Sequence, residues 1–180
     1  MVTIDEIKQL REETGVSITE CQKALKEAAG DLKTAKEILR KRGKDFAKKR
    51  IEKEAGQGII ESYIHPGKKV GAMVELCCES DFVARSEDFQ KLAHELCLQI
   101  AAISPDEIPL GDEPKGSSLP VAKARVGDED KSSSSPFTVA RVLEQAWIKD
   151  ESKNIKELID EYIAKFSENI VIKRFVRYEM

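Results

Sequence analysis

The side chains that could carry chemistry are few in this chain. The histidines and cysteines are His65, His94, Cys21, Cys77, Cys78 and Cys97. No two cysteines form a C-x-x-C pair, which argues against thiol-redox and zinc motifs. One histidine precedes a Pro-Gly turn and the other lies in a helical pattern, so neither is marked as an acid or base. The nucleotide-binding and hydrolase motifs are absent, and the acids are scattered along amphipathic helices. We therefore expect no active site and no metal site.

An acidic and a bulky aromatic residue stand side by side at Asp81 and Phe82. The apolar run 74–78 precedes them and predicts a strand, and a helical pattern from Phe89 to Ile100 follows. A strand-to-helix corner is a place where a rigid scaffold can hold side chains towards a partner. On the local pattern alone, the favoured interpretation is structural. In it, Asp81 caps the next turn and Phe82 packs into the core.

The composition is that of a globular chain with many exposed helices. The sequence has 180 residues, of which 41% are hydrophobic and 35% are charged. This length suits one medium domain, or one domain with a small appendage. The net charge of -3 argues against a surface built as a whole for nucleic acid. We find no signal-peptide pattern and no run long enough to cross a bilayer, and we expect a reducing, cytoplasmic location.

Three short helices with tight turns are predicted at the N-terminus. Capping boxes at 3–6 and 17–20 begin the first two helices, and Asp31 caps a third that we expect Gly43 to end. This pattern predicts a compact three-helix domain over residues 1–43.

A basic linker helix is predicted next, over residues 44–55. The residues from 40 to 53 are rich in lysine and arginine, which we interpret as a solvated helix face. The alternative is a patch that faces RNA, because such clusters attract phosphates. The basic residues are Arg40, Lys41, Arg42, Lys44, Lys48, Lys49, Arg50 and Lys53.

The remaining residues, 56–180, predict an α+β core domain. Their pattern indicates a β-hairpin, a long helix, a second helical segment and a terminal strand that joins the hairpin. Residues 106–136 lose this periodicity and predict an irregular connector. The fold class is therefore α+β, with helices packed on a small antiparallel sheet. The expected segments are strands 59–65 and 70–78, helix 87–103, apolar stretch 142–148, helix 155–166 and strand 170–178.

Residues 79–85 read Glu-Ser-Asp-Phe-Val-Ala-Arg, and several other stretches of the chain follow a shared pattern in the same order. Together they resemble the short bacterial and organellar members of the translation elongation factor Ts family. That family has the signature T-D-F-V-A-[RK], and Ser80 stands here in place of its usual threonine. The resemblance covers about residues 4–103 and 139–180. The other matching stretches are 7–15, 21–25, 28–31, 143–145 and 168–178.

The resemblance implies a guanine-nucleotide exchange factor that binds elongation factor Tu with GDP and promotes release of the GDP. In the family, the Asp-Phe corner wedges between helices of the GTPase domain and disturbs the Mg²⁺ site beside the phosphates. Carried over, the implied partner-binding residues are Ser80, Asp81, Phe82 and Val83. The resemblance implies no cofactor and no metal in the exchange factor itself, because the nucleotide and the ion belong to the partner.

The resemblance also implies that residues 1–43 form a ubiquitin-associated-like domain that docks elsewhere on the GTPase. The implied contacts there are Lys8, Arg11, Ile18 and Thr19. An adaptor module built on the three-helix unit and an RNA-binding protein stay as alternatives, and an enzyme is the least favoured. A homodimer stays open, and neither a direct nucleic-acid partner nor a membrane is expected.

Overall fold

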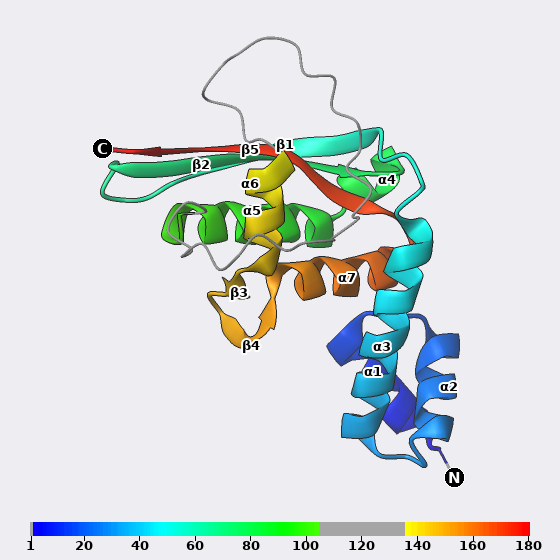
Figure 1. The fold of residues 1–180 in the computed structure, drawn as a ribbon. Helices are drawn as coiled ribbons and strands as arrows, with labels where there is room; N and C mark the ends of the chain where they lie inside the picture. The colour runs from blue at the N-terminus through cyan, green and yellow to red at the C-terminus, as the bar shows by residue number, and fades with distance from the viewer. Residues whose placement is uncertain (1, 105–135) are drawn as a thin grey trace. The chain divides into compact units, whose positions relative to one another are not determined.

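The computed structural model describes residues 2–104 and 136–180. The expected irregular connector therefore lies outside the described residues, apart from its last position. The chain divides into two compact units: residues 1–54 with 157–169, and residues 55–156 with 170–180 (Figure 1). Helices come first, and helices packed on a small antiparallel sheet follow, which confirms the α+β class.

The first unit begins with the three helices that the caps predict. They are α1 (Ile4–Thr14), α2 (Ile18–Glu27) and α3 (Leu32–Arg50). The capping box of α1 is complete. The Thr3 hydroxyl accepts from the Glu6 backbone N–H at 3.2 Å, and the Glu6 carboxylate accepts from the Thr3 N–H at 2.8 Å. The core of the three helices is made of Leu10, Cys21, Ala24, Leu25, Ala28, Ala35 and Leu39.

Helix α3 does not end at Gly43, so that prediction is wrong. The helix continues to Arg50, and Gly43 is buried in its middle. A Cβ atom at Gly43 would lie 3.2 Å from the Cβ of Ala164, in α7 (Ile155–Phe166). Glycine here allows a close helix approach, which offsets its low helix propensity. The expected boundary at residue 43 thus falls inside a helix, and the three predicted domains stay a prediction.

Helix α7 contributes an ion-pair centre to the first unit. The Glu157 carboxylate accepts from the Lys44 Nζ at 2.6 Å and also pairs with the Arg40 guanidinium. The side chain of Glu157 is only 18% exposed. The hydrogen bond from Lys44, with smaller help from Arg40, holds the pKa of Glu157 below its usual value.

We expect Glu157→Gln to lower the free energy of unfolding by about 1 kcal/mol at pH 7. Because the folded pKa is depressed, this contribution is present above the ordinary carboxyl pKa and is lost as the pH falls through the folded pKa. Urea unfolding at several pH values measures it. The difference between the two proteins should shrink on acidification, whereas Glu12→Gln, on an exposed surface, should change little. A difference that does not depend on pH would contradict the prediction.

The second unit is built on a three-stranded antiparallel sheet in the order β1-β2-β5. Its strands are β1 (Gln57–Ile64), β2 (Val70–Cys78) and β5 (Ile170–Glu179). The predicted hairpin and the terminal strand that joins it are both confirmed. Helix α5 (Glu87–Ala102) lies along one face of the sheet (Figure 1). The largest fully buried side chains between them include Val74, Leu76, Phe89, Leu92, Leu96 and Ile100.

A second, smaller hairpin packs against α5 and was not predicted. After α6 (Pro136–Glu144), β3 (Ala146–Trp147) pairs with β4 (Asp150–Asn154), whereas the sequence pattern predicted only an apolar stretch over residues 142–148. The side chain of Gln99, fully buried in α5, holds this hairpin. Its Nε2 donates to the Gln145 Oε1 at 3.0 Å and to the Ala146 carbonyl at 3.1 Å, and its Oε1 accepts from the Ile148 N–H at 2.9 Å.

We expect Gln99→Leu to cost about 2 kcal/mol of unfolding free energy. Leucine fills a similar volume but leaves the Ile148 N–H and the Ala146 carbonyl without that partner, and buried polar groups without partners are costly. Gln90→Leu, on the exposed side of the same helix, is the matched control. Equal urea midpoints for the two variants would show that the Gln99 bonds do not stabilise the hairpin.

Candidate functional site

The candidate site is the corner between β2 and α5, at the end of the sheet opposite the β1–β2 turn (Figure 1). A one-turn helix, α4 (Asp81–Ala84), forms it. Ser80 has an extended backbone, and its hydroxyl accepts from the Val83 N–H at 3.3 Å. The prediction that Asp81 caps this turn is therefore wrong. Serine is as good a cap as aspartate, and Ser80 occupies the position before the helix.

Phe82 points away from the core, which overturns the interpretation based on the local pattern. Its side chain is 85% exposed, whereas Val83 and Ala84 beside it are buried. Successive residues of a helix point about 100° apart, so a single turn can bury two neighbours and expose the third. Large aromatic side chains are normally mostly buried, and an exposed one on a fixed helix is a candidate for contact with a partner.

Asp81 stands beside Phe82 on the exposed side of α4. Its carboxylate lies 2.8 Å from the Arg85 guanidinium, and both side chains are more than half exposed. Such an exposed pair contributes little to stability, so the carboxylate can exchange this partner for another at small cost. The corner thus presents an acid and an aromatic ring together. Ser80 and the buried Val83 shape the turn that carries them.

The N-terminal candidates lie in the first unit. Lys8 and Arg11 are exposed and three residues apart, on one face of α1. Ile18 and Thr19 are exposed in the first turn of α2, after the Ser17 cap. The Ile18 side chain is 54% exposed. The structure thus leaves these four side chains accessible, and their role in docking stays a prediction.

The two histidines pack around Tyr63. The Tyr63 hydroxyl lies 3.2 Å from Nδ1 of His65, and its ring meets the His94 ring edge-on with centroids 5.9 Å apart. Nearby, burial raises the pKa of Cys97 to about 12, so this thiol is a poor nucleophile. Within residues 2–104 and 136–180, no three His, Cys, Asp or Glu side chains are grouped to hold a metal ion.

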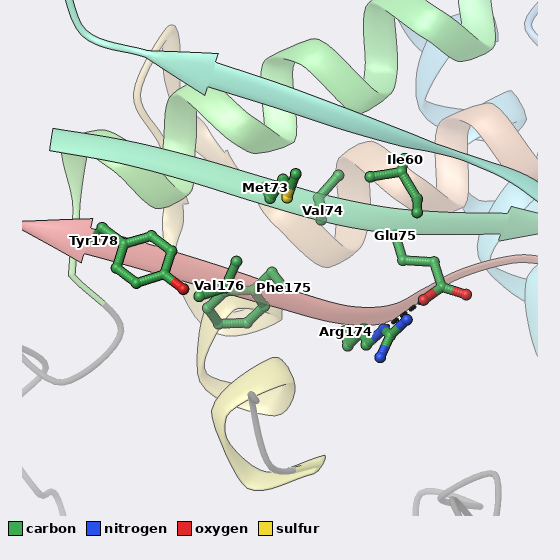
Figure 2. A pocket seen from close by; sticks show the side chains of 8 residues that line it. All are labelled: Ile60, Met73, Val74, Glu75, Arg174, Phe175, Val176 and Tyr178. Atoms are coloured by element: carbon green, nitrogen blue, oxygen red, sulfur yellow. Dashed lines mark hydrogen bonds and ion pairs between the residues drawn. The ribbon is translucent and has the colours of Figure 1, made fainter. Parts of the chain in front are cut away.

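A hollow lined by residues of β1, β2 and β5 is a further surface feature in the described part of the second unit (Figure 2). Its volume of about 230 Å³ is small for an organic ligand. The Glu75 carboxylate there accepts from Lys173 at 2.7 Å and from Arg174 at 2.6 Å, so its charge is already paired. The lining residues are Ile60, Met73, Val74, Glu75, Arg174, Phe175, Val176 and Tyr178. Consecutive apolar residues in β2 (Met73, Val74) and β5 (Phe175, Val176) place apolar side chains on both faces of the sheet, and this pattern could have indicated the surface.

No described helix combines the length and the apolar character that a bilayer-crossing segment needs.

Comparison with known proteins shows similarity to one protein family. Residues 5–115 match the family model described as elongation factor TS. An elongation factor Ts of Coprothermobacter proteolyticus is 42% identical, over 97% of this chain and 95% of its own length. One from an Anaeromyxobacter species is 41% identical, over 96% and 85%. One from Herpetosiphon aurantiacus is 38% identical, over 99% and 98%.

Proposed function

Because this chain belongs to the elongation factor Ts family, we propose that it is a guanine-nucleotide exchange factor for elongation factor Tu. The family membership makes the chain a translation elongation factor with a part in protein biosynthesis. The proposal adds the partner and the action: the chain binds elongation factor Tu with GDP and promotes GDP release. The observation that carries it is the exposed Phe82 on a capped turn whose next two residues, Val83 and Ala84, are buried.

Exchange of this kind is a linkage between two binding sites. A factor that binds the nucleotide-free GTPase better than the GDP-bound form weakens GDP binding by the same ratio. A thousandfold weakening requires about 4 kcal/mol of differential binding energy. Burial of a fully exposed phenylalanine contributes about 2–3 kcal/mol. Phe82 could therefore supply a large share of that energy if its pocket opens only in the nucleotide-free GTPase.

The proposed mechanism places Phe82 as a wedge and Asp81 as its polar companion. Mg²⁺ and phosphate-binding loop contacts hold the nucleotide in such GTPases. A helix displaced by the aromatic ring would weaken those contacts and release GDP. In this mechanism the chain forms and breaks no covalent bond, so we propose a non-enzymatic factor without a cofactor. The most direct experiment is release of a fluorescent GDP analogue from elongation factor Tu, and no acceleration by the folded chain would reject the proposal.

The N-terminal unit is proposed to dock through Ile18. We expect Ile18→Ala to raise the KM for elongation factor Tu with GDP about five- to tenfold, with little change in kcat, because apolar contact area is lost without disturbing the wedge. Steady-state exchange assays measure both constants. Ile51→Ala is the matched control, since Ile51 is an exposed isoleucine of the same unit that lies at the end of α3, outside the proposed contacts on α1 and α2. An equal effect of the two substitutions would contradict docking at Ile18.

We also propose that the chain acts in the cytoplasm without nucleic acid or membrane. Within the basic segment, Arg40 and Lys44 pair with Glu157, and Arg42 pairs with Glu20 and Glu27. These pairs reduce the charge that phosphates could meet. RNA binding that weakens steeply with salt would favour the RNA-binding alternative. Light scattering of the purified chain decides whether it forms a homodimer.

A further inference from the structure

Two serine side chains bracket the one-turn helix that carries Phe82. At its start, the Ser80 hydroxyl accepts from the Val83 N–H at 3.3 Å. At its end, the Ser86 hydroxyl donates to the Val83 carbonyl at 2.8 Å, and the Ser86 backbone N–H donates to the same carbonyl at 3.0 Å. The Val83 N–H is therefore bonded to Ser80, and the Val83 carbonyl is bonded to Ser86.

Ser86 also begins the helix that follows. Its hydroxyl oxygen accepts from the Phe89 N–H at 3.3 Å, as the N-cap of α5. Helix α5 is anchored in the core by the fully buried Phe89. One hydroxyl group thus joins the end of the one-turn helix to the start of a rigid one.

A helix of one turn cannot hold its own shape. Nucleation of an isolated turn is unfavourable, so the conformation of residues 81–84 depends on bonds to neighbouring residues. The direction of Phe82 depends on that conformation, because the same turn that exposes Phe82 buries Val83 and Ala84. When the turn is formed in a smaller fraction of the molecules, the apparent affinity for a partner that needs the exposed Phe82 ring falls by that fraction.

We propose that Ser86 is a positioning residue for Phe82: it ties the corner to α5 and so keeps the aromatic ring in its exposed orientation. The proposal rests on the proposed function, in which Phe82 enters the GTPase. Ser86 lies just after the Glu79–Arg85 stretch and acts through the Val83 backbone. Its effect on exchange must therefore depend on the presence of the Phe82 ring.

The test measures exchange and local opening in the same variants. We expect Ser86→Ala to lower kcat/KM for GDP release about fivefold, and Ser86→Thr, which keeps the hydroxyl, to restore it. In a Phe82→Ala background, Ser86→Ala should lower exchange no further. Asp31→Ala removes a comparable cap from α3 and is the control. It should lower stability as Ser86→Ala does, without lowering exchange.

Amide hydrogen exchange supplies a second measurement that needs no partner. The Val83 amide should exchange about fivefold faster in Ser86→Ala, relative to amides of the sheet. An unchanged rate of GDP release in Ser86→Ala would overturn the proposal, and so would an unchanged exchange rate of the Val83 amide. The proposal would also fail if Ser86→Ala lowered GDP release as much in the Phe82→Ala background as in the wild type. It would fail as well if Asp31→Ala lowered GDP release as much as Ser86→Ala does. If the wild-type chain does not accelerate GDP release, the proposed function fails. The amide result then still decides whether Ser86 holds the turn.

Discussion

Replacement of Phe82 by alanine is expected to lower kcat/KM for GDP release from elongation factor Tu about 30- to 100-fold. A buried aromatic anchor at an interface is typically worth about 2 kcal/mol or more, and a 30- to 100-fold loss corresponds to about 2–2.8 kcal/mol. The folded chain should lose almost no stability, because the side chain is 85% exposed. Fluorescent GDP release measures the first effect, and thermal unfolding measures the second.

The control for Phe82→Ala is another exposed apolar residue of the same unit. Ile64 is 70% exposed and lies next to the β1–β2 turn, whereas the candidate corner follows the other end of β2. Ile64→Ala should leave exchange within about twofold of the wild type. If Phe82→Ala unfolds the chain, the ring is part of the core. If it leaves exchange unchanged, the ring is not the wedge.

Replacement of Phe89 by alanine should have the opposite profile. Phe89 lies seven residues later, is fully buried and belongs to the core between α5 and the sheet. Loss of such a ring costs about 3–5 kcal/mol of unfolding free energy, through lost burial and the cavity that remains. Many proteins have only 5–15 kcal/mol in total, so a measurable unfolded fraction is expected.

Urea unfolding of Phe89→Ala and Phe89→Leu measures this cost. Leucine should recover more than half of the lost stability, because it refills most of the space. Exchange activity per folded molecule should stay near that of the wild type, since the backbone N–H that Ser86 caps is retained. A fully stable Phe89→Ala protein would contradict the assignment of this ring to the core.

The parts of the fold that follow from local rules were predictable from sequence. The caps at Thr3, Ser17 and Asp31 begin the first three helices as expected. The Pro-Gly turn and the apolar runs around it predict the hairpin, and the structure confirms it. Each of these signals lies within a few residues of the element that it specifies.

The features that were not predicted depend on contacts between distant residues. Gly43 was expected to end a helix. It instead lies inside α3 beside Ala164, more than a hundred residues later in the chain, where a side chain at position 43 would have little room. The β3–β4 hairpin depends on Gln99, whose polar side chain on α5 gives no sign of its partners at residues 145–148. No pattern within one segment shows which distant side chain will pack against it.

The candidate corner shows the same limit at a single residue. A one-turn helix has too few residues for periodicity to show which side faces the core, so the general rule for phenylalanine predicted burial. The resemblance of residues 79–85 to a family signature instead predicted an exposed, partner-facing ring. The structure agrees with the exposure of Phe82, and its role at the interface stays a prediction.

The most direct test of the central claim is stopped-flow release of a fluorescent GDP analogue from elongation factor Tu. The measurement compares saturating wild-type chain with the double variant Asp81→Ala/Phe82→Ala, after circular dichroism has shown that both are folded. We predict strong acceleration by the wild type and near-spontaneous release with the double variant. Equal acceleration by both proteins would contradict the claim that this corner drives exchange.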